Sequence, residues 1–89
     1  MIDLRKYVNN DEDFNFLQEI AYDLGPECLS EVELSYKGCK LFSIEPIDNK
    51  YIVLGFGAPI EFAKIEDLFM HLLIEGKSFI EQVADIDYA

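Results

Sequence analysis

The side chains best suited to covalent chemistry are one histidine, His71, and two cysteines, Cys28 and Cys39. A serine or cysteine nucleophile needs a nearby base, usually histidine, that a third group orients. His71 stands four residues from both Asp67 and Glu75, which is ordinary spacing for exposed neighbours on a helix surface. We therefore interpret His71 as a solvated residue. The sequence predicts no catalytic residue and a protein that is not an enzyme.

Metal and cofactor sites are also not expected. One histidine and two cysteines eleven residues apart do not match a zinc-binding spacing, and we expect Cys28 and Cys39 to be reduced thiols. The acidic run Asp11 to Asp13 lacks the mid-loop glycine and distal glutamate of a calcium loop, and is typical of a helix N-terminus. The string from Gly55 to Pro59 places a proline where a phosphate-binding helix would begin.

The remaining candidates for function lie on a predicted amphipathic helix over residues 11–24. Five apolar residues fall within one arc of the helix, and three carboxylates gather on the opposite side as a narrow acidic stripe. Asn10 or Asp11 can cap the first turn, and Gly25 with Pro26 ends the helix. The apolar arc consists of Phe14, Leu17, Ile20, Ala21 and Leu24, and the stripe of Glu12, Glu19 and Asp23.

Phe16 lies at the edge of the acidic stripe, away from the apolar arc. An exposed ring among carboxylates is a plausible binding hot spot, because burial of the ring supplies free energy while the acids select a basic partner. Alternatively, Phe16 packs against the N-terminal segment through Tyr7 or Val8. The predicted partner-binding residues are Glu12, Phe16, Glu19 and Asp23.

A sheet must follow the first helix, because the apolar pattern changes to a period of two after residue 31. Strands are expected at about 31–37, 39–45 and 50–57, with a short fourth strand at 60–62. The run YIVLGF is almost continuously apolar, which predicts a strand covered on both faces in the middle of the sheet.

The C-terminal third predicts two more helices, at about 64–75 and 78–84, followed by a frayed tail or a short strand. Met70 and Ile74 fall outside the apolar arc of the first of these helices, so they are a possible dimer contact or a second covered face. The expected fold is a single α+β domain over residues 1–89. It has an N-terminal amphipathic helix, an antiparallel sheet of three to four strands, and two C-terminal helices packed on the sheet.

The charge of the chain narrows the range of partners. The 89 residues carry a net charge of −11, with 51% hydrophobic composition. Residues 7–36 contain eight acids and no lysine or arginine, residues 65–89 have a net charge of −5, and the segment 37–64 is close to neutral. Acidity of this kind disfavours direct binding to nucleic acid and favours a basic protein partner. We find no apolar run of membrane-spanning length and no secretory signal, and we expect a cytoplasmic protein.

These features favour a small acidic protein-binding domain. Its size and charge resemble those of bacterial immunity proteins, which neutralise basic nuclease toxins, although no specific motif carries the resemblance. The expected function is therefore that of an inhibitor or immunity-type protein. The alternatives are a phage-type mimic of nucleic acid and a homodimeric regulatory or structural subunit, and the nearly neutral middle of the chain weakens the mimic.

Overall fold

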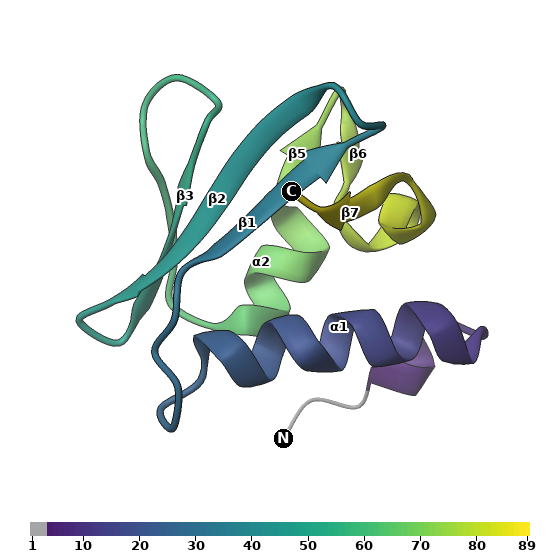
Figure 1. Cartoon of the computed structure of the whole chain (residues 1–89), viewed down its shortest axis with the longest axis horizontal. Helices are drawn as coiled ribbons and strands as arrows, with labels where there is room; N and C mark the ends of the chain where they lie inside the picture. Colours follow the sequence, from purple (N-terminus) through teal and green to yellow (C-terminus); the bar gives the residue numbers. More distant parts are fainter. Residues whose placement is uncertain (1–3) are drawn as a thin grey trace.

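A long helix, α1 (Asp11–Leu24), runs along one side of an antiparallel sheet in the computed structural model, which describes residues 4–89 (Figure 1). Its bounds match the sequence prediction. The side chain of Asn10 caps the helix by accepting a hydrogen bond from the Asp13 backbone N–H at 2.9 Å. A short 3₁₀ helix, η1 (Leu4–Lys6), precedes α1, and the Arg5 guanidinium binds Asp11 at 2.6 Å.

Five strands form the main sheet in the order β4-β3-β2-β1-β7, with every neighbouring pair antiparallel. The middle strand is β2, whereas the sequence pattern placed the YIVLGF strand there. The C-terminal segment, expected to be a frayed tail or a short strand, forms strand β7 at the edge of the sheet beside β1. The strands are β1 (Val32–Tyr36), β2 (Lys40–Ile47), β3 (Lys50–Leu54), β4 (Ile60–Phe62) and β7 (Ile86–Tyr88).

Tight turns set the register of the sheet. Asp48 and Asn49, with φ of 51° and 63°, join the paired residues Ile47 and Lys50, as expected for a two-residue hairpin turn. Strand β2 therefore extends two residues beyond its predicted end. Strand β3 ends at Leu54 and not at residue 57, because Gly55 leaves the extended conformation with a φ of 119°.

The predicted helix over 64–75 is wrong in its second half. Helix α2 (Ile65–His71) ends at His71, and a small hairpin follows, with strands β5 (Leu73–Ile74) and β6 (Lys77–Ser78). Glu75 and Gly76 form its turn with positive φ values of 53° and 85°. Gly76 thus serves a hairpin turn and not a helix cap.

The predicted second C-terminal helix is a 3₁₀ helix, η2 (Ile80–Asp85), broken at Gln82. The Ser78 hydroxyl donates a hydrogen bond to the Glu81 carboxylate at 2.6 Å, and this bond lowers the pKa of Glu81. Gln82 departs from helical geometry, with φ −133° and ψ 34°. Its side-chain amide donates hydrogen bonds to the carbonyls of Ile74 and Lys77, and its oxygen accepts one from the Tyr36 hydroxyl.

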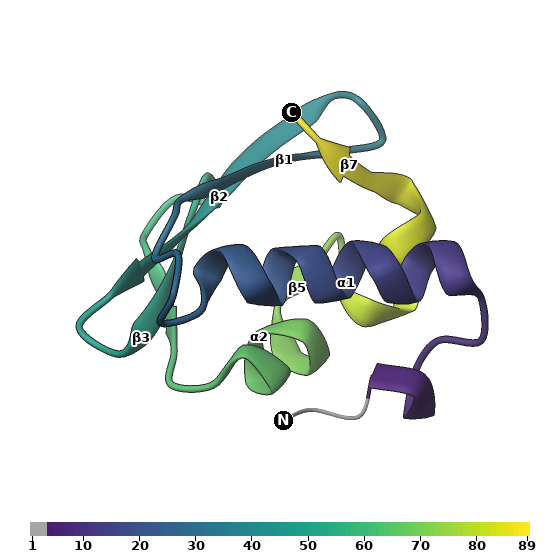
Figure 2. The ribbon, with the colours of Figure 1, turned by 60° about the horizontal axis from the view of Figure 1, so that its bottom comes forward.

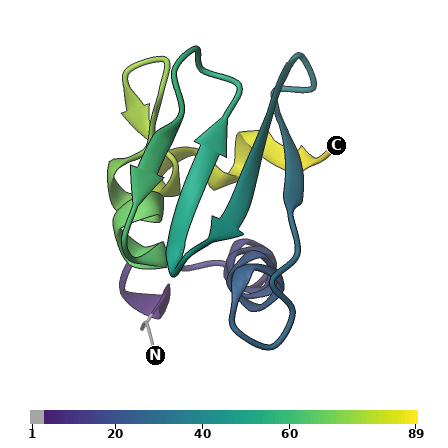
Figure 3. The ribbon, with the colours of Figure 1, turned by 90° about the vertical axis from the view of Figure 1, so that its left-hand side faces the viewer.

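The core lies between the inner face of the sheet and the layer that contains α1 and α2 (Figure 2). Alternate residues of β1 and β2 point inward, as the period of two predicts. Figure 3 looks onto the opposite, outer face, where the strands stand in front of α2 and η2. The most deeply buried core residues include Leu17, Ile20, Leu24, Leu34, Ile44, Val53, Leu68, Phe69 and Phe79.

Candidate functional site

The acidic stripe of α1 lies on the surface beside the C-terminal strand. Glu12 and Glu19 are exposed, and Asp23 is half-buried. Phe16 is also half-buried, and its ring meets that of Tyr88 edge to face, with centroids 5.1 Å apart and an interplanar angle of 72°. This ring pair joins Phe16 to the far end of the chain, a contact that the sequence did not indicate.

Tyr88 joins the residues that the sequence predicted. It lies in β7, where pairing with Leu34 of β1 holds it beside α1, and 45% of it remains exposed. Partial burial raises the pKa of the Tyr88 hydroxyl, and the nearby charges of Glu19 and Asp23 raise it further. We call this surface the α1 acidic face, composed of Glu12, Phe16, Glu19, Asp23 and Tyr88.

Within residues 4–89, no lysine or arginine forms an ion pair with a carboxylate of the α1 acidic face. Among residues 4–89, the ion pairs within 4.0 Å are Arg5 with Asp11 and Lys50 with Glu61. Neither pair includes a member of the face. Glu12, Glu19 and Asp23 therefore remain available to an external cation, and two aromatic rings lie beside them.

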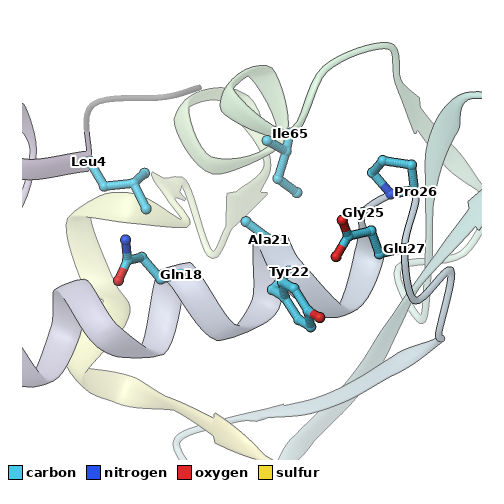
Figure 4. A pocket seen from close by; sticks show the side chains of 8 residues that line it. All are labelled: Leu4, Gln18, Ala21, Tyr22, Gly25, Pro26, Glu27 and Ile65. Carbon is cyan, nitrogen blue, oxygen red and sulfur yellow. The ribbon is translucent and has the colours of Figure 1, made fainter.

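A groove lies along a different side of α1, between this helix and residues Leu4 and Ile65 (Figure 4). Its volume is about 560 Å³, within the range of small-molecule sites, and its walls are mostly apolar. Gln18 and Glu27 are its polar side chains. Tyr22, which is 59% exposed, lies on the side of α1 that separates the groove from the acidic stripe. The lining residues are Leu4, Gln18, Ala21, Tyr22, Gly25, Pro26, Glu27 and Ile65.

The two residues named as a possible dimer contact have different environments. Met70 is 38% exposed on α2, so it remains on the surface. Ile74 is only 1% exposed, because β5 turns its side chain into the core. Ile74 therefore cannot serve as a dimer contact in this structure, and its place outside the helical arc is explained by the hairpin that replaces the helix.

The other candidates for chemistry are separate from one another. His71 is exposed at the end of α2, and Cys28 and Cys39 are exposed free thiols. Asp13 and Asp11 take part in the N-terminal contacts of α1 already described. Within residues 4–89, no group of three or more histidine, cysteine, aspartate or glutamate side chains is arranged to hold a metal ion.

No family model matches this chain, and no curated protein or solved structure gives a significant match either. The described residues 4–89 contain no helix that is long and apolar enough to cross a membrane. Function must therefore be argued from the surface of the protein itself.

Proposed function

We propose that the protein is a small acidic protein-binding domain that neutralises a basic partner, as an inhibitor or immunity-type protein would neutralise a nuclease toxin. The observation that carries the proposal is the α1 acidic face. It combines three carboxylates that form no ion pair within the described part of the chain with the paired rings of Phe16 and Tyr88. Rings of this kind supply binding free energy, and the surrounding charge selects a basic surface.

The acidic sequence around this face strengthens the electrostatic argument. Residues 7–36 carry eight acids and no base, and they include the whole of α1. A basic partner approaching this side experiences attraction before contact, which raises the association rate and makes it sensitive to salt. The same field opposes nucleic acid and also opposes a second copy of the chain on this side.

Charge reversal tests the proposal. We expect the double variant Glu19→Lys/Asp23→Lys to weaken binding to a basic nuclease domain by at least about 100-fold, because it replaces attraction by repulsion. The matched control is Glu66→Lys/Glu75→Lys, which changes the net charge equally at two exposed positions outside the face. The control should change affinity by less than about tenfold.

Both variants should melt within about 2 °C of the wild type, because exposed substitutions seldom change stability by more than about 0.5 kcal/mol. Isothermal titration calorimetry and thermal unfolding measure the two effects separately. Equal losses of affinity in the two folded variants would show that only the overall charge matters, and would refute the assignment of binding to α1.

A further inference from the structure

The outer face of the sheet carries apolar residues that the protein itself leaves uncovered. Leu41 is 65% exposed and Ile47 is 43% exposed, and Ile52 and Leu54 are half-buried beside them. Pairing of Leu54 with Ser43 and of Ile52 with Glu45 places these residues on the side opposite the core. The continuous apolar pattern of β3 predicts cover on both faces, but α1 and α2 cover only the inner one (Figure 3).

A hollow marks the centre of this surface. It has a volume of about 340 Å³ and includes Leu41, Ser43, Leu54 and Gly55 in its lining. Gly55 contributes no side chain there, and its backbone lies so close to β2 that an added Cβ would stand 2.9 Å from the Leu41 carbonyl oxygen. We call Leu41, Ile52 and Leu54 the apolar strip. Leu41 and Leu54 line the hollow, and the half-buried Ile52 lies outside it on β3.

Carboxylates border the apolar strip on both sides. Glu33 lies on β1 across from Ser43. Glu61 lies on β4 across from Ile52, and its carboxylate already stands 3.8 Å from the Lys50 ammonium in an exposed ion pair, which a lysine or arginine of a partner would share or replace. Four adjacent strands span about 14 Å, which is close to the diameter of about 10–12 Å of an α-helix with its side chains. The two acids therefore stand at a separation that suits the basic flanks of one helix lying on the strip.

A second pair of acids on this face also favours the binding of a positively charged side chain. Glu31 directly precedes Val32, which pairs with Ile44 at the end of the β1–β2 ladder, and the carboxyls of Glu31 and Glu45 lie within hydrogen-bonding reach of each other. Like charges directly opposite each other are unfavourable, and a lysine or arginine placed between them would relieve the repulsion. A second copy of the chain would bring more carboxylates to this surface, so charge disfavours a homodimer through it.

We infer that the outer sheet face, composed of Glu31, Glu33, Leu41, Glu45, Ile52, Leu54 and Glu61, is a second docking surface that receives a basic amphipathic helix of a partner protein. The apolar side of that helix would contact Leu41, Ile52 and Leu54, and its lysines or arginines would reach the bordering acids. This surface is built from the sheet and does not depend on the α1 acidic face.

The test uses the full chain and a synthetic 18-residue peptide of leucine and lysine arranged as an amphipathic helix. A scrambled peptide of the same composition controls for charge alone. We expect the helical peptide to bind at least about tenfold more tightly than the scrambled one, because only the former presents a continuous apolar side. Backbone NMR shifts should concentrate on β2 and β3.

The variant Leu41→Ser/Leu54→Ser should weaken binding of the helical peptide by at least about tenfold. The control, Leu29→Ser/Leu73→Ser, removes two leucines that are exposed elsewhere, at 63% and 59%, and should leave affinity within about threefold. Glu19→Gln/Asp23→Asn should also retain peptide binding, which separates this surface from the α1 acidic face. Equal binding of the two peptides, or shifts confined to α1, would overturn the inference.

Discussion

Gly55 shows how a single residue shapes the outer sheet face. Its φ of 119° is poorly suited to other residues, and an added Cβ would lie 2.9 Å from atoms of both Leu41 and Phe42. We expect Gly55→Ala to lower the free energy of unfolding by about 2 to 4 kcal/mol, because backbone strain and a steric clash act together. Chemical denaturation measures this loss.

Gly57→Ala is the matched control, since Gly57 also has a positive φ, 92°, but no neighbour within 4 Å of the added Cβ. We expect Gly57→Ala to lower the free energy of unfolding by only about 1 kcal/mol, from backbone strain alone. Similar losses in the two variants would mean that close packing against β2 contributes nothing.

Glu31 and Glu45 provide a test of charge on the same surface. The side-chain hydrogen bond from Glu45, with partial burial and the repulsion between the two carboxyls, raises the pKa of Glu31 above its ordinary value. Because the pKa is raised in the folded state, the associated stabilisation is present at low pH and is lost as pH rises through that pKa. The charged pair therefore opposes folding near neutral pH.

We expect Glu45→Gln to raise the melting temperature near pH 7, and to lose this advantage below about pH 4, where glutamates are protonated. Glu33→Gln, which removes one charge from the same face, should raise it less because Glu33 lacks this partner. Melting temperatures of the wild type and both variants, measured from below about pH 4 to pH 7, test this expectation. An equal gain from Glu33→Gln would assign the effect to net charge.

The residues of the α1 acidic face were partly predictable. Helical periodicity places Glu12, Glu19 and Asp23 on one side of the helix and Phe16 at its edge, and all four lie on α1 as predicted. Tyr88 could not be identified, because its contact with Phe16 depends on the pairing of β7 with β1, which joins residues over 50 positions apart. Such long-range pairing leaves no local signal beyond the alternation of Ile86 and Tyr88.

At the scale of elements, local signals predicted structure well where they were unambiguous. Helix α1 has an N-cap, an apolar arc and a Gly-Pro stop, and its bounds agree with the prediction. The sequence from Leu72 to Gly76 satisfies two patterns, since Leu72 and Leu73 continue the arc of α2 and the Glu-Gly pair also forms a hairpin turn. Tertiary contacts favour the hairpin, which buries Leu72 and Ile74 and exposes Leu73.

Gln82 connects three elements and explains why the last predicted helix is broken. Its side chain joins β1 through Tyr36, β5 through Ile74 and β6 through Lys77. We expect Gln82→Ala to lower the free energy of unfolding by about 2 to 4 kcal/mol, because it leaves several buried polar groups without partners. Tyr36→Phe removes one of these hydrogen bonds and should cost about 1 kcal/mol.

Denaturant unfolding of both variants measures these differences. If Gln82→Ala cost no more than Tyr36→Phe, the two hydrogen bonds from the Gln82 amide to the β5–β6 hairpin would be unimportant to stability. The hairpin would then depend on its turn and on burial of Ile74.

At the scale of the whole molecule, the net charge of −11 is distributed over surfaces with different structures. The α1 acidic face combines carboxylates with an aromatic pair, and the outer sheet face combines them with exposed aliphatic residues. Both combinations favour basic proteins over free cations, because the apolar groups require a partner with its own apolar surface. Both surfaces therefore support the proposal that the chain is a binding domain.

The salt dependence of association tests the central proposal most directly. Stopped-flow measurement with a basic nuclease domain should give a wild-type rate constant that falls steeply as salt shortens the Debye length from about 30 Å at 0.01 M to about 10 Å at 0.1 M. We expect Glu19→Lys/Asp23→Lys to abolish most of that dependence, and Glu66→Lys/Glu75→Lys to retain it. A rate that does not change with salt, or an equal loss in both variants, would contradict binding of a basic partner through α1.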